Sequence, residues 1–237
     1  MTTADPTGQR ADLAIANRIL ANKNVLDAYG HVSVRDAANP DRFLLARNMA
    51  PAAVTQDDVQ SFDLDAVTDD PRPPYLERFI HSEVYRARPD VHAVVHSHSP
   101  SVLPFTVVSQ PLAAISHMAG FLQDGAPVFE IRDVAGDASD LLIRSQTLAA
   151  SLCAVLGSGA VALMRGHGSV VVGDSLAMVV HRAVFTEMNA KALSQALNLG
   201  QVTALTAGEA ESARRTNDGQ TKRAWDLWSV EAATTAP

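Results

Sequence analysis

The stretch Val91-His92-Ala93-Val94-Val95-His96-Ser97-His98 decides the fold and contains the first candidate site residues. Its first part is a largely apolar run with the length of a buried strand. Since successive side chains in a strand point to opposite faces, His96 and His98 project to the same side at its carboxyl end. Two imidazoles at this spacing can bind one metal ion. The pair alone would fit equally well a surface pair or hydrogen-bonded core histidines.

A third histidine is placed in the same way. His167 lies in Arg165-Gly166-His167-Gly168 and follows a second buried apolar run, residues 161–164. The flanking glycines allow an abrupt turn and a close approach of a ligand. Three neutral imidazoles leave coordination positions open, as a catalytic metal site requires. With His167, the pattern favours a metal site over the two simpler interpretations.

Glu77, His81 and His117 are further candidates. Glu77 begins an amphipathic helix that leads into the His96 strand, so it could be a fourth ligand or a general acid/base. Local sequence alone favours a simpler interpretation, in which Glu77 is a helix N-terminal glutamate stabilised by the helix dipole. His81 lies four residues on and fits a hydrogen-bonding partner better than a ligand. His117, in Ser116-His117-Met118-Ala119-Gly120, is a weaker candidate for the pocket.

Helical and strand patterns alternate along the chain. This interleaving predicts an α/β layered structure with helices covering a central sheet. No internal repeat or strong linker divides the chain, so we expect one domain over residues 1–237, with frayed ends at about 1–9 and 230–237. The expected helices are 10–27, 77–88, 99–108, 141–156, 174–199 and 207–230, the last with a gap, and the expected strands are 31–35, 43–46, 91–95, 127–131 and 161–164.

Composition narrows the class of protein. The net charge of −7 and the lack of a Lys/Arg block argue against nucleic acid as a partner. No apolar run approaches the roughly 18 residues of a membrane span, and the amino terminus has no signal-peptide pattern. The single cysteine, Cys153, lies among apolar residues and is expected to be buried. We therefore expect a cytoplasmic enzyme with no membrane partner.

The series Glu77…His81…Arg88-Pro89-Asp90-Val91…His96-Ser97-His98-Ser99, followed by Arg165-Gly166-His167-Gly168, resembles the class II aldolase/adducin superfamily over residues 12–200. The resemblance implies a three-layer α/β/α fold with a central, largely antiparallel sheet. It implies that His96, His98 and His167 bind one divalent metal ion per subunit, and it raises Glu77 to acid/base or fourth ligand. It also implies a homotetramer with sites near subunit interfaces.

Departures from the sugar-phosphate aldolases of this superfamily point to another substrate. Their Gly-Asn-Val-Ser phosphate turn is replaced by Gly30-His31-Val32-Ser33, and Tyr75-Leu76 replaces the Ser-Ser pair before the glutamate. Most small phosphate donors are therefore lost. Arg35, Arg47 and Arg78 offer cationic groups that suit a carboxylate, although at least one is expected to be an ordinary surface residue.

Residues 25–35 and 117–122 resemble a branch of metal-dependent decarboxylases that act on hydroxylated aromatic dicarboxylates, such as the hydroxy-methylpyridine-dicarboxylate and dihydroxyphthalate decarboxylases. We therefore predict decarboxylation of a small-molecule carboxylate with Mn2+ or Zn2+, Fe2+ or Co2+ being possible. Glu77, His31 or a metal-bound water would supply the proton. The residues expected to bind substrate are Arg35, Arg47, Arg78 and His117.

Three alternatives stay open. Aldol cleavage of a non-phosphorylated hydroxy-carbonyl substrate needs the same metal ligands. Three histidines could also hold Fe(II) for an oxygenase. A metal-free scaffold resembling adducin is the fourth interpretation, but it gives no reason for three convergent imidazoles.

Overall fold

The computed structural model describes residues 6–234, and its centre is one seven-stranded sheet with the order β3-β2-β1-β4-β7-β6-β5. Every neighbouring pair is antiparallel except β5 and β6, which are parallel. The largely antiparallel sheet that the resemblance implied is therefore confirmed. The strands are β1 (His31–Arg35), β2 (Arg42–Ala46), β3 (Val59–Asp63), β4 (Ala93–Ser97), β5 (Val128–Phe129), β6 (Val161–Met164) and β7 (Gly168–Gly173).

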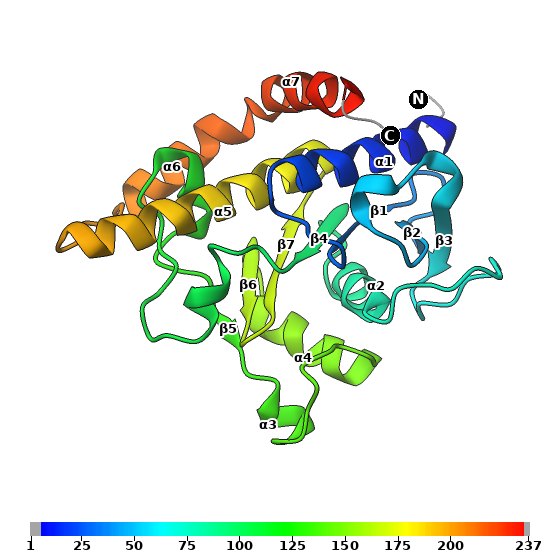
Figure 1. Cartoon of the computed structure of the whole chain (residues 1–237), viewed down its shortest axis with the longest axis horizontal. Helices are drawn as coiled ribbons and strands as arrows, with labels where there is room; N and C mark the ends of the chain where they lie inside the picture. The colour runs from blue at the N-terminus through cyan, green and yellow to red at the C-terminus, as the bar shows by residue number, and fades with distance from the viewer. Residues whose placement is uncertain (1–5, 235–237) are drawn as a thin grey trace.

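Helices cover both faces of the sheet and complete the expected three layers (Figure 1). Helices α1 and α5 run across one face with α7 packed against them, and α2 and α4 pack together on the other face. The helices are α1 (Pro6–Asn22), α2 (Arg78–Ala87), α3 (Arg132–Ala135), α4 (Gln146–Leu156), α5 (Leu176–Leu199), α6 (Ala207–Asp218) and α7 (Thr221–Thr234). Short 3-10 turns are η1 (Pro51–Ala53), η2 (Gln56–Asp58), η3 (Leu103–Thr106) and η4 (His117–Leu122).

The sheet separates two apolar cores because strand side chains alternate between its faces. Val32, Val95 and Val171 belong to the core beneath α1 and α5. Val94 and Val170 belong to the core beneath α2 and α4. The central strands β4 and β7 are buried throughout, which explains why both contain runs of valine.

Local signals define the helix ends. Ser145 and Ser175 cap α4 and α5, and their hydroxyls accept hydrogen bonds from the first turns. Gly157 ends α4 at a φ of +53°, a conformation that favours glycine. Thr206 begins α6 with a capping box that includes Glu209.

Several expected boundaries differ from the structure. Strands β3 and β7 were not predicted, the helix expected at 99–108 shortens to η3, and the strand expected at 127–131 shortens to β5. Residues 6–9 lie in α1 and residues 230–234 lie in α7, within the ends that we expected to be frayed. Residues 1–5 and 235–237 of those ends lie outside the described residues. Across residues 6–234, none of the helices combines the length and the apolar character needed to cross a membrane.

Candidate metal centre

Four side chains meet where three elements end. His96 lies near the end of β4, His98 follows that strand, His167 occupies the turn between β6 and β7, and Glu77 precedes α2. Antiparallel pairing of β4 with β7 places Ser97 opposite Ser169, which brings His167 beside His98. The turn needs Gly168, because a Cβ there would lie 2.0 Å from the carbonyl oxygen of Ser97. The register of β4 with β7 and the small size of Gly168 together bring His98 and His167, which are 69 residues apart in sequence, into contact.

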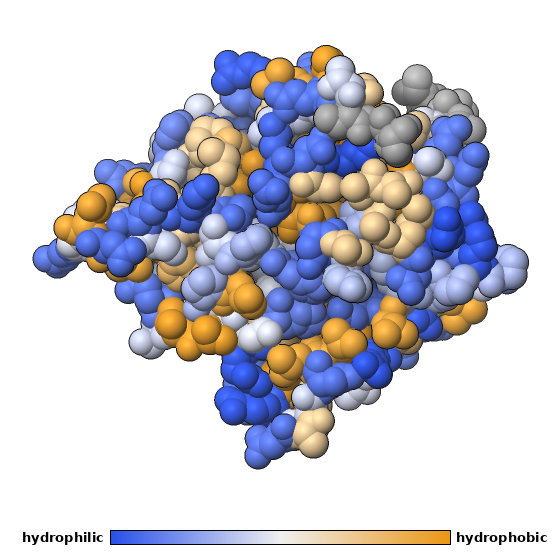
Figure 2. Space-filling model, viewed as in Figure 1, coloured by the Kyte–Doolittle hydropathy of each residue, from blue (hydrophilic) through white to orange (hydrophobic). Residues whose placement is uncertain are grey.

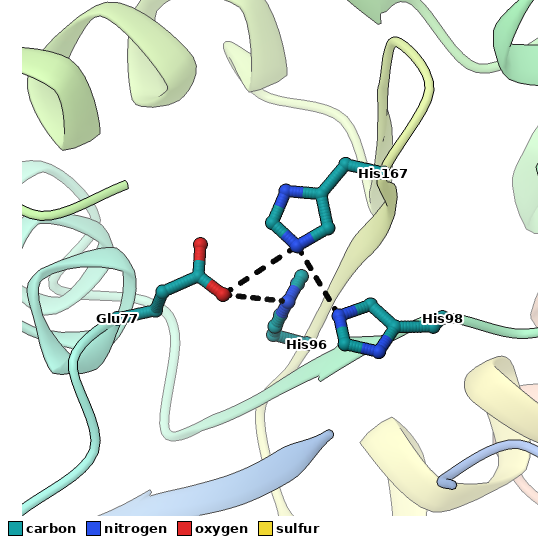
Figure 3. A group of neighbouring side chains, drawn as sticks. All are labelled: Glu77, His96, His98 and His167. Atoms are coloured by element: carbon teal, nitrogen blue, oxygen red, sulfur yellow. Dashed lines mark hydrogen bonds and ion pairs between the residues drawn. The ribbon is translucent and has the colours of Figure 1, made fainter. Parts of the chain in front are cut away.

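The ligand atoms of these four residues lie within 4.8 Å of one another (Figure 3). His98 Nε2 is 3.2 Å from His167 Nε2, and Glu77 Oε2 is 3.4 Å from both His96 Nε2 and His167 Nε2. Ligand atoms bound to one tetrahedral zinc ion at about 2.0–2.1 Å lie roughly 3.3–3.4 Å apart. The spacing therefore fits a single divalent ion.

Each histidine is fixed in the tautomer that a metal ligand needs. His96 Nδ1 donates to the carbonyl oxygen of Ser169 at 3.2 Å, and His167 Nδ1 donates to that of Leu141 at 2.9 Å. His98 Nδ1 donates to the carboxylate of Asp27 at 3.0 Å. Since none of these acceptors carries a proton, each Nδ1 must hold the hydrogen and each Nε2 must hold a lone pair.

Three lone pairs and a carboxylate oxygen that face one another repel unless a cation lies between them. His96 shows this most directly, because its Nε2 is fully buried and has no hydrogen-bond partner among the described residues. Such an orphaned buried acceptor is costly in an ordinary core. The donor set of three imidazoles and one carboxylate suits Zn2+, Mn2+ or Fe2+. The residues present therefore fit a divalent metal ion.

The electrostatics of the cluster are dominated by Glu77. Burial alone would raise the pKa of Glu77, but His96 and His167 hold it well below its usual range. In return, Glu77 raises the pKa of His167 against the opposing effect of burial. Its second oxygen, Oε1, accepts a hydrogen bond from the backbone nitrogen of Ile143 at 2.8 Å. Glu77 is therefore a buried, oriented carboxylate beside two histidines, and not only the helix-start residue that its local sequence favours.

His31 lies next to this cluster. It pairs with His96 in the register of β1 with β4, and the two ring centroids are 5.1 Å apart. His31 is buried, and its Nδ1 lies 2.6 Å from Nε2 of His81. His81 thus contacts His31 and not one of the four cluster residues, in agreement with the expectation that it is a hydrogen-bonding partner and not a ligand.

The arginines expected at the site have different environments. Four of the five N–H donors of Arg35 bind backbone carbonyls of Val91, Pro40, Tyr85 and Arg88, and its guanidinium lies over the Tyr85 ring. The structure therefore gives Arg35 a structural role in place of the carboxylate-binding role that we expected. This is a correction, and its cause is that the polar face of β1 is covered by α2.

Arg47 and Arg78 keep free donors. Arg47 Nε donates to Asp58 at 2.7 Å, and its two terminal nitrogens make no hydrogen bond with the described residues. Arg78 donates to the carbonyl oxygens of Ala66 and Tyr75 through Nε and Nη1 only. His117 is exposed at the start of η4, where its carbonyl accepts a hydrogen bond from Asn217 in α6. No contact links His117 to the four cluster residues within this chain.

Sequence reasoning missed Asp27 and the polar residues around His31. Asp27 Oδ1 accepts from the backbone nitrogens of Tyr29 and Gly30, while Oδ2 accepts from His98. The turn signal at Asp27-Ala28-Tyr29-Gly30 could have placed this carboxylate in a turn, but its histidine partner is 71 residues away. Ser33 and Tyr85 also escaped notice, because nothing local shows that they face His81.

Comparison with known proteins agrees with this geometry. Residues 11–193 match the family described as the class II aldolase and adducin N-terminal domain. The chain is 36% identical over 241 residues to decarboxylase tropJ of Talaromyces stipitatus, which covers 91% of each protein. It is 30% identical over 194 residues to a 3,4-dihydroxyphthalate decarboxylase of Arthrobacter keyseri, which covers 75% of this chain and 74% of the relative.

Solved structures show the same fold. An L-fuculose 1-phosphate aldolase from Glaciozyma antarctica superposes with a TM-score of 0.80 at 20% identity, over 99% of this chain and 95% of that one. The fold and the two decarboxylase relatives together make this protein an enzyme of the lyase class. The chain belongs to the class II aldolase and adducin family, in which its sequence falls with the decarboxylases.

Proposed function

We propose that this protein is a divalent-metal-dependent decarboxylase of a hydroxylated aromatic or heteroaromatic carboxylate. The observation that carries the proposal is the convergence of three imidazole Nε2 lone pairs and Glu77 Oε2 within 4.8 Å, in a chain whose similar relatives include decarboxylases. His96, His98 and His167 would hold the ion. Glu77 would be a fourth ligand or would act as acid/base beside it.

The chemistry follows from the charge that decarboxylation creates. When the bond to the carboxylate breaks, carbon dioxide leaves and the electron pair stays on the ring carbon. A bound divalent ion would supply Lewis-acid stabilisation of the negative charge that a neighbouring ring oxygen then shares. A proton must finally replace the lost carboxylate, and Glu77 and His31 are the titratable side chains that we propose for this step.

A second carboxylate on the ring would need a cationic partner. The free terminal nitrogens of Arg47 and the free Nη2 of Arg78 are proposed for this role. His117 remains a proposed substrate-binding residue only through a neighbouring subunit, because it is exposed and is not in contact with the cluster of its own chain.

Aldol cleavage of a non-phosphorylated substrate is the second candidate, because aldolases share this fold and would need the same ion. Tyr75 argues against a sugar phosphate at this position. Its ring lies 4.6 Å from His31, and its hydroxyl donates to the carbonyl oxygen of Met49 at 2.5 Å, so a short hydroxyl is replaced by a buried ring. An Fe(II) oxygenase is not favoured, since relatives with at least 30% identity over at least 75% of this chain are named decarboxylases.

We also propose association into a homotetramer with sites near subunit interfaces. Three exposed apolar side chains follow His98 in the sequence. Their exposed fractions are 38% for Leu103, 61% for Val107 and 52% for Val108. The surface seen in Figure 2 is mostly hydrophilic, and its apolar side chains lie in separate patches. An apolar segment that follows a metal ligand so closely is a reasonable place for a neighbouring subunit.

The test is a measurement of carbon dioxide release. Chelator-treated protein is reloaded with Mn2+ or Zn2+ and given 3,4-dihydroxyphthalate and related hydroxy-aromatic diacids, with oxygen and under argon. We expect metal-dependent release of carbon dioxide at the same rate in both atmospheres. Turnover that needs oxygen would select the oxygenase. Cleavage of a hydroxy-carbonyl probe without carbon dioxide would select the aldolase, and full turnover without metal would rule the proposal out.

A further inference from the structure

A continuous chain of buried polar groups runs from His31 away from the metal cluster. His31 Nδ1 lies 2.6 Å from His81 Nε2, and His81 Nδ1 lies 2.6 Å from Ser33 Oγ. Ser33 Oγ lies 2.8 Å from the hydroxyl of Tyr85. None of these four side chains is more than 2% exposed. We call these residues the His31 chain.

The fold explains how the chain forms. His31 and Ser33 alternate with Val32 on β1 and therefore share the face that α2 covers. His81 and Tyr85 are four residues apart on α2 and therefore share the helix face turned toward β1. The Phe43 ring packs against His81 and Tyr85, and the Phe62 ring stacks on Phe43 behind it.

Only one direction of hydrogen bonding satisfies every buried proton. Burial lowers the pKa of His81 to about 3, so its ring is neutral and carries one proton. If that proton were on Nδ1, it would point at Ser33 Oγ, and either the Ser33 or the Tyr85 hydroxyl proton would have no acceptor. If it is on Nε2, Tyr85 donates to Ser33, Ser33 donates to His81 and His81 donates to His31. Buried donors without acceptors are rare because they lose free energy.

We propose that Ser33 and His81 are positioning residues that hold His31 with its proton on Nε2, as a fixed hydrogen-bond donor to an oxygen of a substrate bound at the metal centre. The inference rests on the proposed function, because it needs a substrate beside His96. His31 Nδ1 receives the His81 proton, so the hydrogen of the His31 ring must lie on Nε2. That nitrogen has no hydrogen-bond partner among residues 6–234, and it belongs to a ring 5.1 Å from that of His96.

The chain positions His31 but does not supply it with protons. If His31 gave its Nε2 proton to a substrate carbon, the His31 chain could return a proton only from Tyr85. Burial raises the pKa of Tyr85 well above its usual value, and its hydroxyl has no hydrogen-bond partner beyond Ser33 among residues 6–234. The role left to His31 is a hydrogen bond to a substrate oxygen, such as the second carboxylate of a diacid. The proton that replaces the carboxylate then reaches carbon by a route other than the His31 chain.

The tautomer can be read directly by nitrogen NMR of the Zn2+-loaded protein labelled with 15N-histidine. We expect the wild-type His31 signals to show a proton on Nε2, and the signals that disappear in His31→Gln identify the residue. Ser33→Ala removes the group that directs His81, so we expect a mixture of His31 tautomers. Ser82→Ala is the matched control, because Ser82 is equally buried but donates to the Phe79 carbonyl outside the His31 chain. Its His31 tautomer should match that of the wild type.

Turnover of 3,4-dihydroxyphthalate gives the second measurement. We expect Ser33→Ala to lower kcat/KM about tenfold with most of the loss in KM, and Ser82→Ala to leave it unchanged. His31→Gln keeps an N–H near the Nε2 position and should retain more activity than His31→Asn, whose amide reaches only the Nδ1 position. Equal losses in the two variants would contradict a donor role at Nε2.

The two proposals fail separately. A wild-type His31 with its proton on Nδ1 would overturn this inference even if carbon dioxide were released normally. Absence of carbon dioxide release would overturn the proposed function, while the NMR measurement would still determine the tautomer. A Ser33→Ala variant with an unchanged His31 tautomer would show that Ser33 does not direct the chain. Thermal unfolding of each variant confirms that the protein is folded.

Discussion

Five of the eight histidines lie in two groups that touch across the β1–β4 ladder, and the groups differ in how their polar atoms are satisfied. In the metal centre, His96, His98 and His167 each turn a bare Nε2 toward Glu77. In the His31 chain, His81 binds His31 through Nε2 and Ser33 through Nδ1. The lone pairs of the metal centre are satisfied only when a cation is bound. The polar hydrogens of the His31 chain all have an acceptor, except the Nε2 hydrogen of His31.

This difference shows how similar residues receive different tasks from their neighbours. Backbone carbonyls and Asp27 take the Nδ1 protons in the metal centre, which leaves Nε2 as a ligand. In the His31 chain, the Ser33 hydroxyl lies at Nδ1 of His81 and donates a hydrogen bond to it. His81 therefore carries its proton on Nε2. Burial alone does not separate the groups, because His81 and His96 are both completely buried.

The strongest way to break the comparison is to remove a ligand from the metal centre. We expect His96→Ala or His167→Ala to abolish bound metal and turnover, because two remaining imidazoles cannot hold the ion firmly. Elemental analysis, circular dichroism and carbon dioxide release are the measurements. His92→Ala removes an exposed histidine near the start of the same strand and is the control. Unchanged metal content and rate in both ligand variants would remove the basis for the metal centre.

Glu77→Gln tests the carboxylate of the same group with a smaller change. Its amide oxygen can still accept the hydrogen bond from Ile143, so the side chain should keep its place. We expect the three histidines to retain metal while turnover falls about 10²- to 10⁴-fold, as when a general acid/base is removed. Metal content and kcat are the measurements, and Glu83→Gln on the same helix is the control. A normal rate would reduce Glu77 to a residue that only begins a helix.

Asp27→Asn sharpens the comparison, because it changes which nitrogen of His98 carries the proton. The amide oxygen can keep the bonds from Tyr29 and Gly30, which places the amide NH2 opposite His98 Nδ1. His98 would then carry its proton on Nε2 and lose its lone pair toward the ion. We expect metal affinity to fall about 10- to 100-fold with the fold intact. Competition with a chelator measures it, and the exposed Asp124→Asn is the control. Equal affinities would show that the Asp27 bond does not set this tautomer.

Much of this arrangement could be predicted from sequence, and the part that could not depends on distant partners. The apolar runs before His96 and His167 predicted two strands that end at one site, and the register of β4 with β7 agrees with that prediction. Strand β7 (Gly168–Gly173) was missed although residues 170–172 are all valines. The strand begins directly at the glycine of the His167 turn, so no polar segment separates the turn from the strand. The alternation in His31–Arg35 correctly indicated one polar face, but that pattern is typical of a half-exposed strand.

The polar face of β1 is covered by α2. This explains why the role of Arg35 was predicted wrongly and why Ser33 and Tyr85 were missed. Arg35 was expected to bind a carboxylate, but the carbonyls of Tyr85 and Arg88 lie 50 and 53 residues away in sequence and capture its guanidinium. Ser33 meets His81 across 48 residues. Helical spacing predicts that His81 and Tyr85 share a face, but no local pattern shows which strand that face will meet.

The smallest expected effect concerns a buried histidine outside both groups. His181 packs against Phe185, and its Nδ1 is buried without a hydrogen-bond partner among the described residues. Burial lowers the pKa of His181 to about 4, although Asp218 opposes the shift and Arg182 adds to it. The folded state therefore resists a proton that the unfolded state binds below pH 6.5. The stabilising contribution of neutral His181 is present above pH 6.5 and is lost as the pH falls toward 4.

His181→Phe keeps a ring against Phe185 and removes this titration. Between pH 7.5 and pH 5, we expect the free energy of unfolding to fall by about 1 kcal/mol less in the variant than in the wild type. Urea unfolding at the two pH values, with a chelator present so that metal release does not contribute, measures the difference. His92→Phe changes an exposed histidine and should follow the wild type. If His181→Phe follows it too, the acid sensitivity belongs to the two groups of site histidines, and His181 is protonated as readily in the folded protein as in the unfolded one.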